Sequence, residues 1–127
     1  MKKMAILSLV LCFASLCAAE TEHQNVKPLA DVKKEIAEGK AVLVDVREKD
    51  EWDEGHVKDA KWIPLSTLKS GTGDLSSVSK DKPIYTYCRS GKRSLIAATL
   101  LSDKGYHASS LKEGFDDMPK NGFEASK

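Results

Sequence analysis

A seven-residue segment combines a cysteine with groups that favour its ionised form. It reads Cys88-Arg89-Ser90-Gly91-Lys92-Arg93-Ser94. Three cations fall within this segment, and Gly91 lets the backbone curl so that its N–H groups point inward as a cradle for an anion. The thiolate is the nucleophile of cysteine chemistry, and cations and helix N-termini lower the pKa of the thiol. The segment, called the cysteine loop below, therefore predicts a reactive cysteine with an anion-binding loop.

The spacing within the cysteine loop favours one kind of chemistry over another. Cysteine phosphatases and arsenate reductases with such a cradle place five residues between the cysteine and an arginine that wraps a tetrahedral oxyanion. Here four residues separate Cys88 from Arg93, and Ser94 follows. A shorter loop makes a tighter cup, which suits one sulfur atom carried on the cysteine better than a phosphate. Sulfur transfer is therefore the predicted chemistry.

Structural roles for the same residues stay open. A lone cysteine can be an inert core residue, and an arginine at a strand–helix junction can simply pair with a nearby carboxylate. For Arg89 both a site role and a structural ion pair are open, whereas Arg93 is expected in a structural pair. His56 follows Gly55 and is expected to hydrogen-bond within its own loop rather than act as a general base. No histidine is spaced to share a metal with Cys88.

The elements that must position the cysteine loop alternate between helices and strands. The expected helices are 29–38 and 92–103, the expected strands are 41–46, 62–64, 83–87 and 107–111, and 69–82 is a loop or weak helix. This alternation predicts an α/β fold with a parallel sheet covered by helices on both faces. Ligands bind such sheets beyond the carboxyl ends of the strands, where Cys88 is expected.

Length and charge limit the function classes. A chain of 127 residues with 41% hydrophobic residues suits one domain with a packed core. Its 20 basic and 19 acidic side chains give a net charge of +1. That balance creates no global field to hold nucleic acid or an anionic membrane. A basic site must therefore be local, as the cysteine loop is.

The first nineteen residues have the order of a secretory signal peptide. Lys2 and Lys3 precede an apolar run that ends in small residues at Ala19. The run is shorter than the roughly 20 apolar residues of a spanning helix, and an uncleaved anchor is the alternative. A leucine precedes both Cys12 and Cys17, which disfavours a lipoprotein. We expect cleavage after Ala19 and export, with the bacterial periplasm as the compartment.

Cleavage would remove two of the three cysteines and reverse the sign of the net charge. It would leave 108 residues, 18 basic against 19 acidic side chains, and Cys88 as the one cysteine. The expected organisation is a polar tether at 20–27, a domain at 28–121 and a polar tail at 122–127. No stable membrane insertion is expected after cleavage, and no long exposed apolar stripe argues against a monomer.

Three segments resemble the single-domain rhodanese family, in its small exported form. The first is Asp45-Val46-Arg47-Glu48 with the run from Glu51 to Ala60, the second is the cysteine loop, and the third is Glu113-Gly114-Phe115 with Met118. Asp59, Glu113 and Met118 depart from the family pattern, and these departures lie away from the cysteine loop. The resemblance spans about residues 28–120.

The resemblance implies a five-stranded, mostly parallel sheet and catalysis through a persulfide on Cys88. The thiolate would take sulfur from a donor such as thiosulfate, release sulfite, and pass the sulfur to cyanide or a thiol. Backbone N–H groups of residues 89–94 would stabilise the persulfide, and Arg89 and Lys92 would attract the donor. Asp45, Arg47 and His56 are fold residues in this family. No metal or organic cofactor is implied.

Two other functions compete with sulfur transfer by an enzyme. Rhodanese-like domains also serve as interaction or sulfur-carrier modules, although interaction units typically lack the cysteine that is present here. A redox thiol that forms mixed disulfides is the third hypothesis, and the predicted mature chain offers no second cysteine to resolve them. Trp52 and Trp62 suggest a ligand platform, but both are expected to be buried against the sheet.

Overall fold

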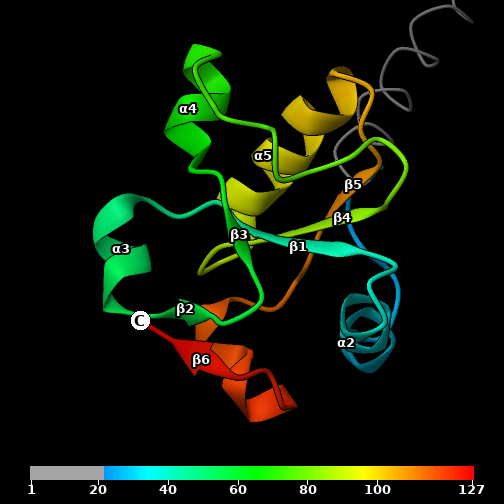
Figure 1. Cartoon of the computed structure of the whole chain (residues 1–127), viewed down its shortest axis with the longest axis vertical. Helices are drawn as coiled ribbons and strands as arrows, with labels where there is room; N and C mark the ends of the chain where they lie inside the picture. The colour runs from blue at the N-terminus through cyan, green and yellow to red at the C-terminus, as the bar shows by residue number, and fades with distance from the viewer. Residues whose placement is uncertain (1–21) are drawn as a thin grey trace, which may run out of the picture.

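A parallel sheet of four strands organises residues 22–127, which the computed structural model describes (Figure 1). The strands are β1 (Val42–Asp45), β3 (Lys61–Trp62), β4 (Ile84–Tyr87) and β5 (Ala108–Ser110), in the order β3-β1-β4-β5. Every pairing in this sheet is parallel. The predicted α/β fold class is confirmed, while the strand count of this sheet differs from the expected five.

The remaining strand pairing lies outside the main sheet. Strand β2 (His56–Val57) pairs with β6 (Ala125–Ser126) in an antiparallel ladder of two residues each. At the β5 edge of the main sheet, Gln24 forms one isolated parallel bridge with Ser110. Among residues 22–127, the position beyond β5 therefore holds a single bridge rather than a fifth strand.

Helices cover both faces of the main sheet. They are α2 (Leu29–Ala37), α3 (Lys49–Glu54), α4 (Leu65–Ser70) and α5 (Lys92–Asp103), followed by the 3-10 turns η1 (Phe115–Asp117) and η2 (Pro119–Asn121). Figure 1 shows α2 on the opposite side of the sheet from α4 and α5. Within residues 22–127 no helix is long and apolar enough to cross a membrane. The predicted signal peptide lies outside the described residues.

The core divides into two clusters, one on each face of the sheet. Leu43 and Tyr85 pack with α2, whereas Val44 and Ile84 pack with α4 and α5. Successive side chains of a strand point to opposite faces, so a strand covered on both sides reads as a continuous apolar run. Cys88 belongs to the second cluster.

The helix that carries the end of the cysteine loop buries one stripe rather than its whole circumference. Its buried residues are Ser94, Ala97, Ala98 and Leu101, which share the helical spacing of three and four residues. Ile96 is 44% exposed on the other side. The prediction of a well-buried helix is thus correct for one face of α5 and wrong for the other.

Both ends of the described chain pack on the domain, which differs from the expected tether and tail. At the N-terminal end, the Ser110 N–H donates to the His23 carbonyl at 2.6 Å, and the Asn25 N–H donates to the Ser110 carbonyl at 2.8 Å. At the C-terminal end, Phe123 is buried and β6 pairs with β2. These contacts are made by backbone groups and by one buried aromatic side chain. Neither produces a periodic pattern in the sequence, so the contacts could not be predicted from it.

A buried ion pair fixes the loop after β1. Arg47 donates from Nη2 to Asp45 Oδ2 at 2.7 Å and from the same nitrogen to the Gly55 carbonyl at 2.7 Å. Both side chains are essentially inaccessible to solvent. The guanidinium also lies 4.3 Å from the centre of the Phe115 ring. This arrangement agrees with fold roles for Asp45 and Arg47.

The two tryptophans differ in burial. Trp52 is half-buried, and its ring stacks on His56 at a centroid distance of 3.5 Å. His56 Nδ1 lies 2.9 Å from the Trp52 carbonyl, so His56 bonds to the preceding helix α3 rather than within its own loop. Trp62 is 36% exposed, which contradicts the expected burial, because β3 is an edge strand. Its indole N–H donates to the Arg47 carbonyl at 2.9 Å.

Candidate active site

Cys88 directly follows β4, at the carboxyl end of a central strand of the parallel sheet. Gly91 is the N-cap of α5, with a φ of 88° in the left-handed region that favours glycine. Four residues, 88–91, therefore turn the chain from strand to helix, and the first amides of α5 have no partner within the helix. The predicted position of Cys88 in a strand–helix loop is confirmed.

Hydrogen-bond donors surround the sulfur of Cys88. The Gly91 N–H donates to Sγ at 3.1 Å, the Ser94 N–H donates at 3.4 Å, and Ser94 Oγ lies 3.4 Å from the same sulfur. Cys88 and Ser94 are both fully buried. The curled loop thus directs its N–H groups at the sulfur, as the sequence predicts.

These donors favour the thiolate over the thiol. Burial by itself raises the pKa of Cys88, because it disfavours the charged form. The Ser94 hydroxyl and the backbone N–H groups of Ser94, Gly91 and Ser90 act in the opposite direction and outweigh burial. The pKa of Cys88 consequently lies below the ordinary value for a thiol, and the ionised nucleophile is more abundant near neutral pH.

The arginines of the loop converge on one carboxylate. Arg93 donates from Nη1 to Glu51 Oε1 at 2.6 Å and from Nη2 to Oε2 at 2.9 Å. Arg89 Nε lies 3.4 Å from the same Oε2. The structural ion pair expected for Arg93 is therefore present, Arg89 joins it, and Lys92 is exposed at the first position of α5.

Sequence reasoning did not identify Glu51 as part of this site. Glu51 is the third residue of α3, where its side chain also accepts the Glu48 N–H at 3.4 Å in a capping box. The Glu48-x-x-Glu51 spacing is a readable signal for the start of α3. The link from Glu51 to Arg93 spans 42 positions in the chain, so no local pattern could have revealed it.

Replacement of Glu51 by glutamine should destabilise the protein in a pH-dependent way. Hydrogen bonds from Arg93 outweigh burial and lower the pKa of Glu51 from 4.5 to about 2. Because the folded-state pKa is depressed, this stabilisation is complete above about pH 4.5 and is lost as the pH falls towards 2. We expect Glu51→Gln to lower the free energy of unfolding at pH 7 by about 1–2 kcal/mol, as measured by urea unfolding. The free energy of unfolding of this variant should also fall less than that of the wild type as the pH is lowered.

Glu38→Gln is the matched control for Glu51→Gln. Glu38 pairs with Lys40 at 2.8 Å, but both side chains are exposed. An exposed pair contributes about 0–1 kcal/mol, so this variant should have nearly the wild-type free energy of unfolding at pH 7. That free energy should also fall with decreasing pH as it does in the wild type. Equal effects of the two substitutions would contradict the assigned role of Glu51.

Gly114 lies where the segment after β5 touches the cysteine loop. A Cβ atom on Gly114 would lie 1.9 Å from the Arg89 carbonyl oxygen and 2.7 Å from its carbonyl carbon. The Phe115 N–H donates to the Cys88 carbonyl at 2.9 Å in the same contact. Backbone meets backbone here, so no flexible side chain can move aside. Glycine at 114 is therefore required by the close approach.

Gly114→Ala should displace the cysteine loop. The backbone at Gly114, with a φ of −97°, accepts alanine without strain, so the effect comes from the collision with Arg89. Overpacking of this kind costs about 1–3 kcal/mol. We also expect a higher pKa of the Cys88 thiol, measured by the pH dependence of its alkylation, because the N–H groups of the displaced loop no longer point at the sulfur.

Gly39→Ala serves as the control for Gly114→Ala. Gly39 has a φ of 72° and no heavy atom within 4 Å of an added Cβ. Its substitution should cost about 1 kcal/mol through backbone strain and leave the Cys88 thiol unchanged. An unaltered thiol in Gly114→Ala would refute the steric role of Gly114.

Comparison with known proteins identifies the class to which this fold and loop belong. The profile of the rhodanese-like domain matches residues 28–120. The chain belongs to the rhodanese-like family. This result confirms the family resemblance and the extent that the sequence motifs suggested.

Individual relatives agree with this membership. The Bacillus subtilis protein named "Uncharacterized protein YqhL" is 35% identical over 118 residues, which cover 91% of each chain. A protein named "Sulfurtransferase" from Allochromatium vinosum is 35% identical over 65 residues, which cover 51% of this chain and 58% of that protein. The human single-domain sulfurtransferase TSTD1 superposes with a TM-score of 0.63 at 28% identity, covering 72% of this chain and 92% of that one.

Proposed function

We propose that the protein is a sulfurtransferase that carries sulfur as a persulfide on Cys88. The observation that carries the proposal is the set of donors around Sγ, with N–H groups of Gly91 and Ser94 at 3.1 and 3.4 Å. These fixed dipoles favour the thiolate and would stabilise a persulfide anion without rearrangement. Family membership and the sulfurtransferases among the relatives support the same reaction class.

Thiosulfate is the donor that the charge of the loop fits. The Cys88 thiolate attacks the outer sulfur of thiosulfate and forms a new S–S bond. The bond between the two thiosulfate sulfurs breaks, and its electron pair leaves on sulfite. The resulting persulfide anion gives its outer sulfur to cyanide or to a thiolate, which regenerates the Cys88 thiolate. Exposed Arg89 and Lys92 attract the anionic donor.

A turnover assay tests the reaction class. We expect thiosulfate and cyanide to give thiocyanate and sulfite in equal amounts, with no release of phosphate from a phosphate ester supplied instead. Formation of a persulfide without turnover would indicate a sulfur-carrier or interaction module. Hydrolysis of the phosphate ester without thiocyanate formation would contradict the proposal and favour phosphatase chemistry.

We also propose that the protein is exported and that residues 1–19 are removed. The support is the order of two lysines, an apolar run and small residues before Glu20. N-terminal sequencing of the protein from the periplasmic fraction of a bacterial host should begin at Glu20. A chain that keeps Met1 and stays in the cytoplasm would contradict export.

A further inference from the structure

A second buried hydroxyl group continues the hydrogen-bond network behind Cys88. Ser94 Oγ, which lies 3.4 Å from the cysteine sulfur, is 2.7 Å from Ser110 Oγ. Ser110 Oγ is in turn 3.3 Å from the Leu111 carbonyl. Ser94 and Ser110 are both fully buried, so solvent does not supply alternative partners. The sulfur is therefore connected to β5 through two hydroxyl groups.

We propose that Ser110 is a positioning residue for Cys88, because its hydroxyl bonds to Ser94 and thereby directs the Ser94 hydroxyl hydrogen at the cysteine sulfur. The inference deepens the sulfur-transfer proposal and rests on it. Ser110 itself does not contact the reacting atoms. Its effect reaches them through Ser94.

The two hydroxyl groups satisfy both protonation states of the cysteine. With the thiol, Sγ–H donates to Ser94, Ser94 donates to Ser110, and Ser110 donates to the Leu111 carbonyl. With the thiolate, Ser110 donates to Ser94, and Ser94 donates to the sulfur anion. Only the two O–H groups rotate; the proton of the thiol leaves to solvent and does not travel along the network. In the persulfide Sγ has no hydrogen to donate, so the Ser94 hydroxyl can bond to it only as a donor, as with the thiolate.

Neighbouring strands hold both serines in place. The Ser110 N–H donates to the His23 carbonyl at 2.6 Å, and the Ser110 carbonyl accepts Gln24 Nε2 at 2.7 Å. On the other side, Thr86 Oγ1 of β4 donates to the Ser94 carbonyl at 2.8 Å. Ser110 is therefore fixed by backbone contacts that a change of its side chain leaves intact.

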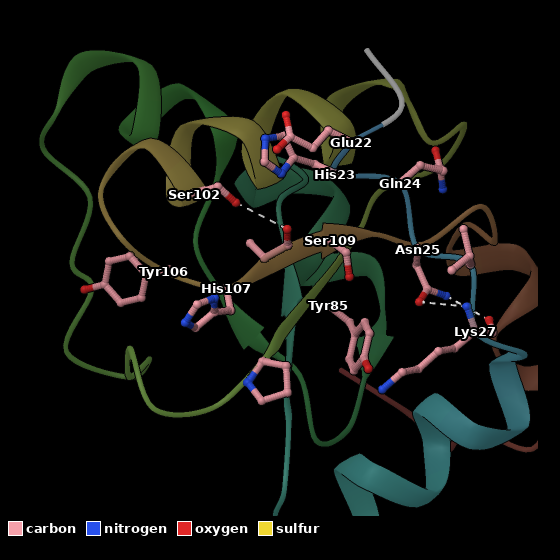
Figure 2. A pocket seen from close by; sticks show the side chains of 13 residues that line it. Glu22, His23, Gln24, Asn25, Lys27, Tyr85, Ser102, Tyr106, His107 and Ser109 are labelled. Carbon is pink, nitrogen blue, oxygen red and sulfur yellow. Dashed lines mark hydrogen bonds between the residues drawn. The ribbon is translucent and has the colours of Figure 1, made fainter. Parts of the chain in front are cut away.

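The adjacent serine of β5 provides a matched control. Ser109 points to the other side of the strand, into an open pocket that His23 and His107 also line (Figure 2). Ser109 and Ser110 share a strand and differ in the face that they present. Ser109→Ala therefore makes the same chemical change without touching the network.

The variants leave the charges around the loop unaltered. The loop itself carries Arg89, Lys92 and Arg93, and the segments that pack against it bring ionisable side chains that include Glu48, Glu51, Lys112, Glu113, Asp116 and Asp117. A change in the thiol caused by Ser110→Ala would therefore come from the hydroxyl network and not from a lost charge.

The experiment measures the pKa of Cys88 in a double-mutant cycle. The alkylation rate of the Cys88 peptide is followed by mass spectrometry against pH, which separates it from other cysteines. We expect Ser94→Ala to raise this pKa by about one unit and Ser110→Ala by about half a unit. The double variant should match Ser94→Ala alone, because Ser110 acts only through Ser94. Ser109→Ala should show the wild-type value.

The outcomes decide between positioning and a merely structural role. An unchanged pKa in Ser110→Ala, or additive shifts in the double variant, would overturn the inference. Ser110→Cys, which fills the site with a slightly larger group that donates only weakly, replaces alanine if that variant does not fold, and should raise the Cys88 pKa in the same way. Thiocyanate formation is measured separately. Its absence in the wild-type protein, together with no persulfide on Cys88, would refute sulfur transfer, whereas the pKa cycle would still test Ser110.

Discussion

Cys88→Ala is expected to reduce thiocyanate formation from thiosulfate and cyanide by more than about a thousandfold, to the rate without protein. The reaction needs a sulfur that forms and breaks an S–S bond, and Cys88 is the one cysteine among residues 22–127. No other described side chain can carry the transferred atom. Initial rates of thiocyanate formation at saturating thiosulfate measure the effect.

Cys88→Ser separates nucleophilicity from the shape of the loop. A serine hydroxyl can accept the N–H groups of Gly91 and Ser94 that now bond to the sulfur, so the loop should keep its conformation. Its hydroxyl stays protonated near neutral pH and cannot form a persulfide. We therefore expect a folded protein, with a cooperative thermal transition, that is as inactive as Cys88→Ala. Appreciable turnover by either variant would contradict a role for Cys88 as the sulfur carrier.

Asp45→Asn is expected to lower the free energy of unfolding by about 3–5 kcal/mol. The substitution leaves the Arg47 guanidinium buried without its carboxylate, although the Gly55 carbonyl still accepts from Nη2 at 2.7 Å. The amide keeps one oxygen that can still accept the Arg47 backbone N–H, now bonded to Oδ1 at 2.9 Å, but its NH2 group replaces Oδ2, the oxygen that accepts from Nη2 at 2.7 Å. A buried charge that loses its partner keeps its full desolvation cost, which explains the size of the effect. Urea unfolding at pH 7 measures it.

An exposed ion pair provides the matched comparison for Asp45→Asn. Lys49 Nζ and Asp53 Oδ2 are also 2.7 Å apart, but both side chains are more than half exposed. Asp53→Asn should therefore change the stability by no more than about 0.5 kcal/mol. Similar small losses in both variants would show that burial of the Asp45–Arg47 pair does not stabilise the fold as described.

Long periodic segments of the sequence were sufficient to predict the frame of the protein. Strands β1 and β4 and helices α2 and α5 agree with expectation. A continuous apolar run marks a strand buried on both faces, and apolar residues at helical spacing mark a helix buried on one face. Helices α3 and α4 have six residues each, and β2 and β6 have two. Such short elements carry no periodicity, and tertiary contacts define them.

The candidate site likewise has one part that could be predicted from the sequence and one part that could not. The place of Cys88 and the inward N–H groups follow from a local strand–loop–helix pattern, which is why they could be predicted. Glu51, Gly114 and Ser110 reach the loop from other segments, and their contacts depend on how those segments pack. The wrong expectation for Trp62 has a similar origin, since an edge position in the sheet cannot be read from residue type.

The mass of the intact protein after incubation with thiosulfate tests sulfur transfer most directly. We predict a gain of one sulfur atom, about 32 mass units, on the peptide that contains Cys88, and its loss on addition of cyanide. Cys88→Ala should gain nothing under the same conditions. A wild-type protein that gains no sulfur, or that gains it on another residue, would contradict a persulfide on Cys88.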